Sequence, residues 1–181
     1  MMRSNVEIVD EVPNLYRIIR LETLRRTPGV SFDFVPVTAL GPIAAVDRVI
    51  HAGGAISPGP VGDVERPWYM HPCQADNLIV LHGTRYVDIY TPEHGRVESF
   101  TVSPDRVETH GRTVAEGAAI LIWSRRVFHR IRSCEKAGSA SLNLAVHYDG
   151  FDIRTNFNVY DLDPSTGRHT VLREGHLDQP Q

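Results

Sequence analysis

Short apolar runs recur along most of this chain, and their spacing constrains the fold more than any other feature of the sequence. From about Val30 onward, alternating or β-branched apolar residues end in clusters of Gly, Pro, Asn or Asp roughly every 8–12 residues. Runs this short suit strands joined by turns and are too short for ordinary helices. We therefore predict an all-β sandwich or barrel. The predicted strands are Phe32–Val37, Ala45–His51, Asn77–Leu81, Arg85–Tyr90, Arg96–Val102, Ala119–Trp123, Arg130–Ser133, Ser141–Tyr148, Asn156–Asp161 and His169–Arg173.

Helical spacing occurs in one segment only. Leu15, Ile18 and Ile19 begin a pattern that continues to Leu24, and Thr27-Pro28-Gly29 follows as a stop signal. We expect at most one or two short helices in the chain.

Turn signals indicate how the strands connect. His82-Gly83 is predicted to close a tight hairpin. The Gly- and Pro-rich segment 53–62 is interpreted as a long loop at the rim, because residues 1–52 are too few and too broken for a core of their own. The prediction is one domain over 1–181, with extra strands within 30–52 and 156–173 flanking a barrel at about 62–148.

Charge and hydropathy argue against several classes of partner. The formal net charge of −3 offers no general attraction for nucleic acid or an anionic membrane. The N-terminus lacks the apolar region of a signal peptide, and the apolar run from Ala118 to Trp123 is far shorter than the roughly 20 residues that cross a bilayer. We expect a cytoplasmic protein in which Cys73 and Cys134 are reduced thiols.

Two histidines stand beside strongly apolar segments. His71 precedes the run Leu78–Leu81, and His129 follows the run Ala118–Trp123. Within Ser141–Tyr148, strand alternation places Asn143, Ala145 and His147 on one face and apolar residues on the other. Polar residues inside and apolar residues outside are typical of a barrel whose cavity holds a ligand.

These segments resemble the two motifs of the cupin superfamily. In the first motif, Gly83 stands at the closing Gly, Asp76 at the Glu, His71 at the second His and Tyr69 at the first His; in the second motif, His129 stands at the His. The resemblance implies a double-stranded β-helix, or jelly-roll, barrel with extra N- and C-terminal strands. It also implies that His71 and His129 converge in the barrel interior.

Within that superfamily, the segment Leu78–Tyr90 is most similar to the RmlC-like nucleotide-sugar epimerases and isomerases, typified by dTDP-dehydrorhamnose epimerase. This resemblance implies proton transfer without a metal or other cofactor, a nucleotide-sugar ligand and a homodimer. His71 is the expected base, since His is the usual choice for removing a carbon-bound proton near neutral pH.

The other expected roles follow from the same resemblance. Asp76 or Asp88 would orient the base. The acid would be Tyr69, Tyr86 or Tyr148. The predicted catalytic residues are His71, Tyr69 and Asp76, and the predicted substrate-binding residues are Gln74, Arg85, Arg126, His129, Asn143 and His147; Arg125 and Arg130 are further candidates for phosphate contacts.

Two alternative functions fit the same residues. His71, Asp76 and His129 form a two-His, one-carboxylate set that suits Fe, Mn, Ni or Zn, with Cys73 or Gln74 as substitute ligands, and would serve a cupin of the dioxygenase or lyase type. The other alternative is a cupin that binds a small polar ligand without catalysis.

Overall fold

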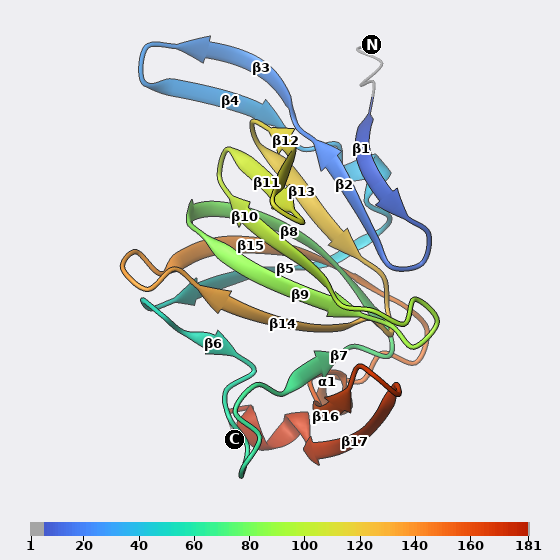
Figure 1. Ribbon diagram of the computed structural model, residues 1–181. Coiled ribbons are helices and arrows are strands. Elements are labelled where there is room, and N and C mark those ends of the chain that lie inside the picture. Colours follow the sequence, from blue (N-terminus) through green and yellow to red (C-terminus); the bar gives the residue numbers. More distant parts are fainter. Residues whose placement is uncertain (1–5, 181) are drawn as a thin grey trace.

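The computed structural model describes residues 6–180, and its main body is two antiparallel β-sheets packed face to face (Figure 1). The first sheet has six strands. In spatial order they are β1 (Glu7–Val12), β2 (Tyr16–Arg20), β13 (Ala119–Trp123), β8 (Gln74–Gly83), β15 (Ser139–His147) and β5 (Ile43–His51).

The second sheet has nine strands. In spatial order they are β12 (Arg112–Glu116), β11 (Arg106–Thr109), β10 (Glu98–Ser103), β9 (Arg85–Tyr90), β14 (Phe128–Ser133), β7 (Trp68–Met70), β16 (Val159–Asp163) and β17 (Arg168–Arg173), and β6 (Ile56–Ser57) pairs with β14. The predicted all-β architecture is confirmed.

The remaining elements lie at the two ends of the sandwich (Figure 1). A separate hairpin of β3 (Glu22–Thr27) and β4 (Val30–Phe34) projects from one end. The helical elements are the short α1 (Ile153–Asn156) and the 3-10 turns η1 (Val37–Ala39) and η2 (Gly175–Asp178). Within residues 6–180, no helix is long and apolar enough to cross a membrane.

The main core lies between the two sheets. Leu78 and Leu121 of the first sheet belong to one buried cluster with Val87, Ile89 and Phe100 of the second. Each of these side chains is at most 2% exposed. The inward-facing positions recur every second residue, as the period of a strand requires.

The helix predicted from Leu15 to Leu24 is wrong, because this segment forms β2 and the start of β3. Ile18 packs in the core between the sheets, whereas Ile19 packs in a second apolar cluster on the outer side of the first sheet. Both faces of the strand are therefore buried, and two-sided burial produces consecutive apolar residues that imitate helical spacing.

The hairpin predicted at His82-Gly83 is also wrong, because β8 and β9 lie in different sheets. Gly83 has φ 70° and turns the chain from one sheet toward the other. A Cβ at this position would overlap the backbone carbonyl of Gly138, so the crossing requires glycine.

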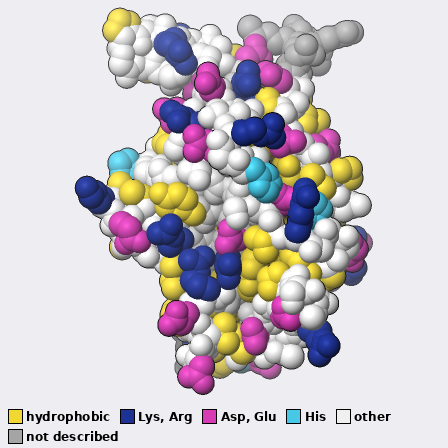
Figure 2. Space-filling model, viewed as in Figure 1, with side chains coloured by type: hydrophobic (Ala, Val, Ile, Leu, Met, Phe, Trp, Pro, Cys, Tyr) yellow, Lys and Arg dark blue, Asp and Glu magenta, His cyan; other side chains and the backbone are white. Residues whose placement is uncertain are grey.

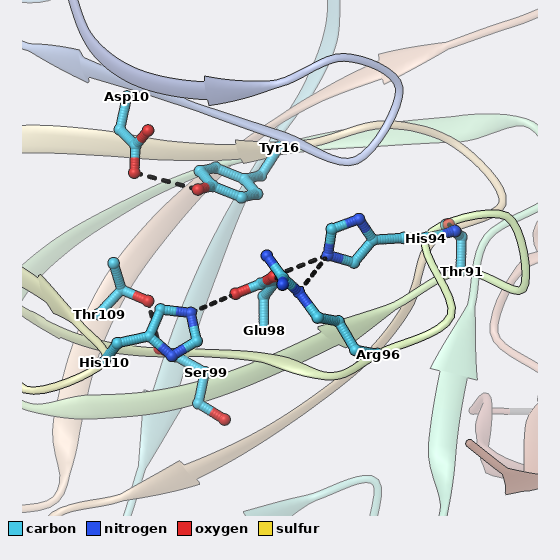
Figure 3. A network of polar contacts seen from close by, with 9 residues as sticks. All are labelled: Asp10, Tyr16, Thr91, His94, Arg96, Glu98, Ser99, Thr109 and His110. Atoms are coloured by element: carbon cyan, nitrogen blue, oxygen red, sulfur yellow. Dashed lines mark hydrogen bonds and ion pairs between the residues drawn. The ribbon is translucent and has the colours of Figure 1, made fainter. Parts of the chain in front are cut away.

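A buried carboxylate anchors the loop between β9 and β10 (Figure 3). Glu98 is 1% exposed and accepts hydrogen bonds from His94 Nε2 (2.6 Å), Arg96 Nε (2.7 Å) and His110 Nε2 (2.6 Å). Burial opposes ionisation of Glu98, but these three donors outweigh it and hold its pKa below the ordinary value. The three contacts tie the loop to the edge of the nine-stranded sheet.

Over most of the face shown in Figure 2, acidic and basic side chains are interspersed. Such mixing is what the small net charge leads one to expect.

Candidate active site

His71 follows the last residue of β7 and is 5% exposed. Its Nδ1 lies 2.5 Å from the backbone carbonyl oxygen of Asn156. A carbonyl oxygen only accepts, so Nδ1 carries a hydrogen and Nε2 is the nitrogen that faces Asp76. That Nε2 lies 3.5 Å from Asp76 Oδ2.

His129 stands on β14, opposite Tyr69 of β7 and Ile89 of β9. Its Nδ1 donates to the carbonyl oxygen of Val127 at 3.2 Å, and its ring centroid lies 4.7 Å from that of His71. Burial and the neighbouring His71 lower the pKa of His129 to about 4. His129 is therefore neutral at neutral pH.

Asp76 is held by two amides. Its Oδ1 accepts from Gln74 Nε2 and from Asn143 Nδ2, both at 2.7 Å, and Gln74 is itself fixed by Asn156 Nδ2 at 2.9 Å. Burial opposes ionisation of Asp76, but His71, His129 and the two amides outweigh it, so its pKa lies below the ordinary value.

The second carboxylate oxygen of Asp76 has a different environment. Oδ2 is buried and has no hydrogen-bond partner within the described part of the chain. One potential ligand atom from each of His71, Asp76 and His129 lies within 4.8 Å of the others. These three side chains therefore place two imidazole nitrogens and a carboxylate oxygen close enough together to share one cation or one proton. The residues fit a divalent transition metal in donor type and spacing.

Tyr69 completes this cluster. Its ring centroid lies 6.2 Å from that of His71 and 6.0 Å from that of His129, and burial raises its pKa, so its hydroxyl remains a proton donor at neutral pH. The other two candidate acids lie elsewhere. Tyr86 packs under Arg132 on another surface, and Tyr148 lines a groove outside the barrel.

These side chains line a cavity of about 350 Å³ between the two sheets. The lining residues are Asp47, Val49, His51, Ser57, Tyr69, His71, Gln74, Asp76, Leu78, Arg85, Trp123, His129, Ile131, Asn143 and Phe157. The mixture of aromatic walls with a few convergent polar groups is typical of a small-ligand site.

Nine residues were predicted to be catalytic or substrate-binding, and seven of them line this cavity. The seven are Tyr69, His71, Gln74, Asp76, Arg85, His129 and Asn143. The other two do not. Arg126 is exposed in the turn between β13 and β14, where its backbone N–H donates to the His71 carbonyl, and His147 stacks on Phe151 at the end of β15. His147 lies on the same face of β15 as Asn143, as predicted, but beyond the end of the cavity.

Several lining residues were not predicted from the sequence. Asp47 and His51 come from the flanking strand β5, whose pairing with β15 brings them beside the motif residues. Phe157 packs edge-on against His71 from the segment after α1, with 4.9 Å between ring centroids. The alternation within β5 was the one available hint for Asp47 and His51, and no local pattern marked Phe157.

At the far end of the cavity lies a second polar group. Arg85 Nε donates to Ser139 Oγ at 3.0 Å, Ser139 Oγ lies 2.8 Å from Ser133 Oγ, and Ser133 Oγ lies 2.9 Å from His51 Nδ1. Burial, together with Arg85, lowers the pKa of His51 to about 4, so His51 is neutral.

Comparison with known proteins identifies the fold. No protein-family model and no curated protein matches this chain. QdtA, a sugar 3,4-ketoisomerase from Thermoanaerobacterium thermosaccharolyticum in complex with TDP, matches with a TM-score of 0.54 and 12% identity over 78% of this chain and 85% of its own.

Two epimerases are similar to the same degree. NovW, a 4-keto-6-deoxy sugar epimerase from the novobiocin cluster of Streptomyces spheroides, has a TM-score of 0.56 and 15% identity over 81% of this chain and 71% of its own. The RmlC epimerase of Mycobacterium tuberculosis has a TM-score of 0.52 and 12% identity over 77% and 66%. At 12–15% identity these likenesses show the fold alone, and they confirm the predicted jelly-roll barrel.

Proposed function

We propose that this chain, which has the RmlC-like cupin fold, is an isomerase or epimerase that moves a proton on a keto sugar, free or nucleotide-linked, without a metal. One observation carries the proposal. His71 is fixed through Nδ1 by the Asn156 carbonyl oxygen and directs Nε2 toward the Asp76 carboxylate, 3.5 Å away at the wall of the cavity, where that charge would stabilise an imidazolium. QdtA is a ketoisomerase and NovW an epimerase, and their similar fold suggests the reaction class.

In the proposed reaction, His71 Nε2 removes a proton from the carbon next to the substrate's carbonyl group. The C–H electron pair moves into the carbonyl and gives an enolate, and the Tyr69 hydroxyl donates a proton or hydrogen bond to its oxygen. In epimerisation, solvent returns a proton to the opposite face of the same carbon, and the enol proton goes back to Tyr69. In isomerisation, the His71 imidazolium returns its proton to the former carbonyl carbon, and the hydroxyl on the first carbon loses its proton to the Tyr69 phenolate and becomes the new carbonyl.

His129 supports the assignment of His71 as the base, because His129 stays neutral. Two charged imidazoles 4.7 Å apart would repel each other, and the low pKa of His129 leaves His71 as the site that accepts the proton. Asp76 and its two amide donors supply a fixed negative charge that needs no reorganisation during the transfer.

A metal-dependent function of the dioxygenase or lyase type is the second candidate, and the unpartnered Oδ2 of Asp76 favours it. His71, Asp76 and His129 would hold the ion. A bound divalent transition metal would act as a Lewis acid toward a substrate oxygen. The hydrogen bonds from both Nδ1 atoms to carbonyl oxygens would serve equally to orient two metal ligands.

Solvent deuterium exchange tests the proposed function. Free and TDP-linked 4-keto-6-deoxy sugars incubated with the protein in D₂O should gain deuterium next to the carbonyl, as measured by mass spectrometry. A His71→Asn variant keeps a donor for the Asn156 carbonyl but has no base, and should abolish exchange. The exposed His82→Asn is the matched control and should not change it. Exchange that survives in His71→Asn would contradict the assignment of the base.

Metal analysis separates the two candidates. The purified protein is exposed to Fe(II), Mn(II), Ni(II) or Zn(II), freed of excess ion and assayed for bound metal and for exchange. The metal-free mechanism predicts full exchange after treatment with a chelator. Stoichiometric metal that is lost in an Asp76→Asn variant, with exchange that depends on it, would establish the second candidate instead.

We also propose a homodimer located in the cytoplasm. Edge strand β5 exposes Val46 and Ile50, and the projecting β3–β4 hairpin exposes Leu24 and Phe32. Sheet edges and lone hairpins are stabilised by pairing with a partner. The two free cysteines suit a reducing compartment. Sedimentation as a monomer at micromolar concentration would contradict the dimer.

A further inference from the structure

Among the arginines within residues 6–180, Arg85 is the one that lines the cavity. It stands on β9 and is 2% exposed. Its guanidinium contacts only neutral groups within the described chain, namely Ser139 Oγ at 3.0 Å and the Val49 carbonyl oxygen at 3.5 Å. Burial alone lowers the pKa of Arg85 to about 10, and no acidic neighbour raises it. Arg85 is therefore a buried cation without a counter-ion.

Other arginines of the protein show what is missing. Arg17, Arg130 and Arg173 are all more exposed, and each is paired with a carboxylate at 2.6–2.9 Å. An exposed guanidinium is stabilised by water, whereas a buried one needs an anion to offset its lost hydration. Arg85 is more buried than these three arginines, and of the four it is the one without a carboxylate partner. The missing negative charge is what a ligand would supply.

The surroundings of Arg85 suit an anionic oxygen group. Its Nη1 makes no hydrogen bond within residues 6–180, so a donor remains available at the cavity wall. Ser139 and Ser133 hold the guanidinium from behind through their linked hydroxyls. A planar guanidinium fixed on one edge presents its remaining N–H groups to carboxylate or phosphate oxygens.

This group stands apart from the proton-transfer residues. Arg85 bonds to Ser139 and Asp76 bonds to Asn143, and these two partners are four residues apart on β15, or about 13 Å of strand. The cavity thus has an acid–base end at His71 and a cationic end at Arg85. The cavity volume of about 350 Å³ lies at the small end of ligand sites.

We propose that Arg85 binds a carboxylate or phosphate group of the ligand inside the barrel. The ligand is then a compact anionic sugar, such as a uronate or a sugar phosphate, held by its charge at one end and by its reacting carbon at the other. The reaction at that carbon rests on the function proposed above. The anion site itself rests only on the geometry of Arg85.

Binding measurements on the full-length protein test this inference. The probes are D-glucuronate, D-glucose 6-phosphate, inorganic phosphate and neutral D-glucose, titrated at constant ionic strength. The readouts are calorimetry and the NMR resonance of the Arg85 Nε–H group. We expect at least one anionic probe to bind at least ten-fold more tightly than glucose and to shift that resonance. The carboxylate and phosphate arms decide which anion the site prefers.

Variants localise the effect. Arg85→Gln should lower the affinity for the anionic probe at least ten-fold, and exposed Arg112→Gln should leave it unchanged. If Arg85→Gln does not fold, Arg85→Lys keeps the charge but not the planar fork and should weaken binding several-fold. The inference is overturned if no anionic probe shifts the Arg85 resonance, or if binding is equal in wild type and the folded Arg85 variant. Anion binding without deuterium exchange would refute the proposed reaction and leave the anion site standing.

Discussion

The Glu98 cluster of Figure 3 allows a quantitative test of how this fold tolerates a buried charge. Replacing His94 and His110 by alanine removes one donor from each oxygen of a carboxylate that is 1% exposed, and leaves Arg96 as its remaining ion-pair partner. A hydrogen bond to a charged group contributes about 1.5–3 kcal/mol, so removing both imidazoles while Arg96 still pairs with Glu98 should cost about 3 kcal/mol or more. We expect the double variant to lose about that much free energy of unfolding.

Replacing the carboxylate itself should cost less. Glu98→Gln removes the buried charge, and the side chains of Arg96 and His110 are more than half exposed and can be hydrated instead. The free energy of unfolding should fall by about 1–2 kcal/mol, because hydrogen bonds are weakened but no buried charge is left without a partner. Adding Glu98→Gln to the His94→Ala/His110→Ala variant should therefore restore part of its stability.

Urea unfolding at neutral pH, followed by the fluorescence of the buried Trp68 and Trp123, measures all four proteins of this cycle. The reasoning is refuted if the histidine variant is as stable as Glu98→Gln, or if Glu98→Gln destabilises the two backgrounds equally. Either result would mean that the Glu98 charge is well solvated.

The same residue sets a pH dependence. The pKa of Glu98 lies below its ordinary value in the folded protein and near about 4.3 in the unfolded chain. In the window between these values, the unfolded chain binds the proton and the folded protein does not, so stability rises with pH. The contribution is complete above about pH 5 and is lost as the pH falls below about 4. In Glu98→Gln, the free energy of unfolding should depend less on pH in this acidic range. An unchanged pH dependence would mean that other carboxylates cause it.

Three further predictions concern the backbone, the core and the site. Gly83→Ala should destabilise far more than Gly29→Ala in thermal unfolding, since both glycines have positive φ but only Gly83 faces a backbone carbonyl; equal losses would disprove the steric argument. Leu121→Ala should cost about 2–5 kcal/mol and the exposed Leu24→Ala under about 0.5 in urea unfolding, and similar values would place Leu121 outside the core. Tyr69→Phe should slow deuterium exchange about 10²-fold or more without changing thermal stability much, and unchanged exchange would remove Tyr69 as the acid.

Local sequence was sufficient for the architecture and for the centre of the site. Strand alternation and regular turn signals predicted the all-β sandwich, because a period of two and a period of 3.6 are distinguishable wherever one face of an element is exposed. Motif position singled out His71, Asp76 and His129, which the fold brings within 4.8 Å.

Tertiary structure decided what depends on both faces of a strand or on distant partners. The segment from Leu15 to Leu24 imitated a helix because Ile18 and Ile19 are buried in different clusters, and no local pattern reveals a second layer of packing. The pairing of β5 with β15 places Asp47 and His51 at the cavity wall. Arg126 lies in the turn between β13 and β14 and does not line the cavity. Only the fold shows that Arg85 is buried without a carboxylate, because burial and pairing are properties of neighbours that the chain brings together from far apart.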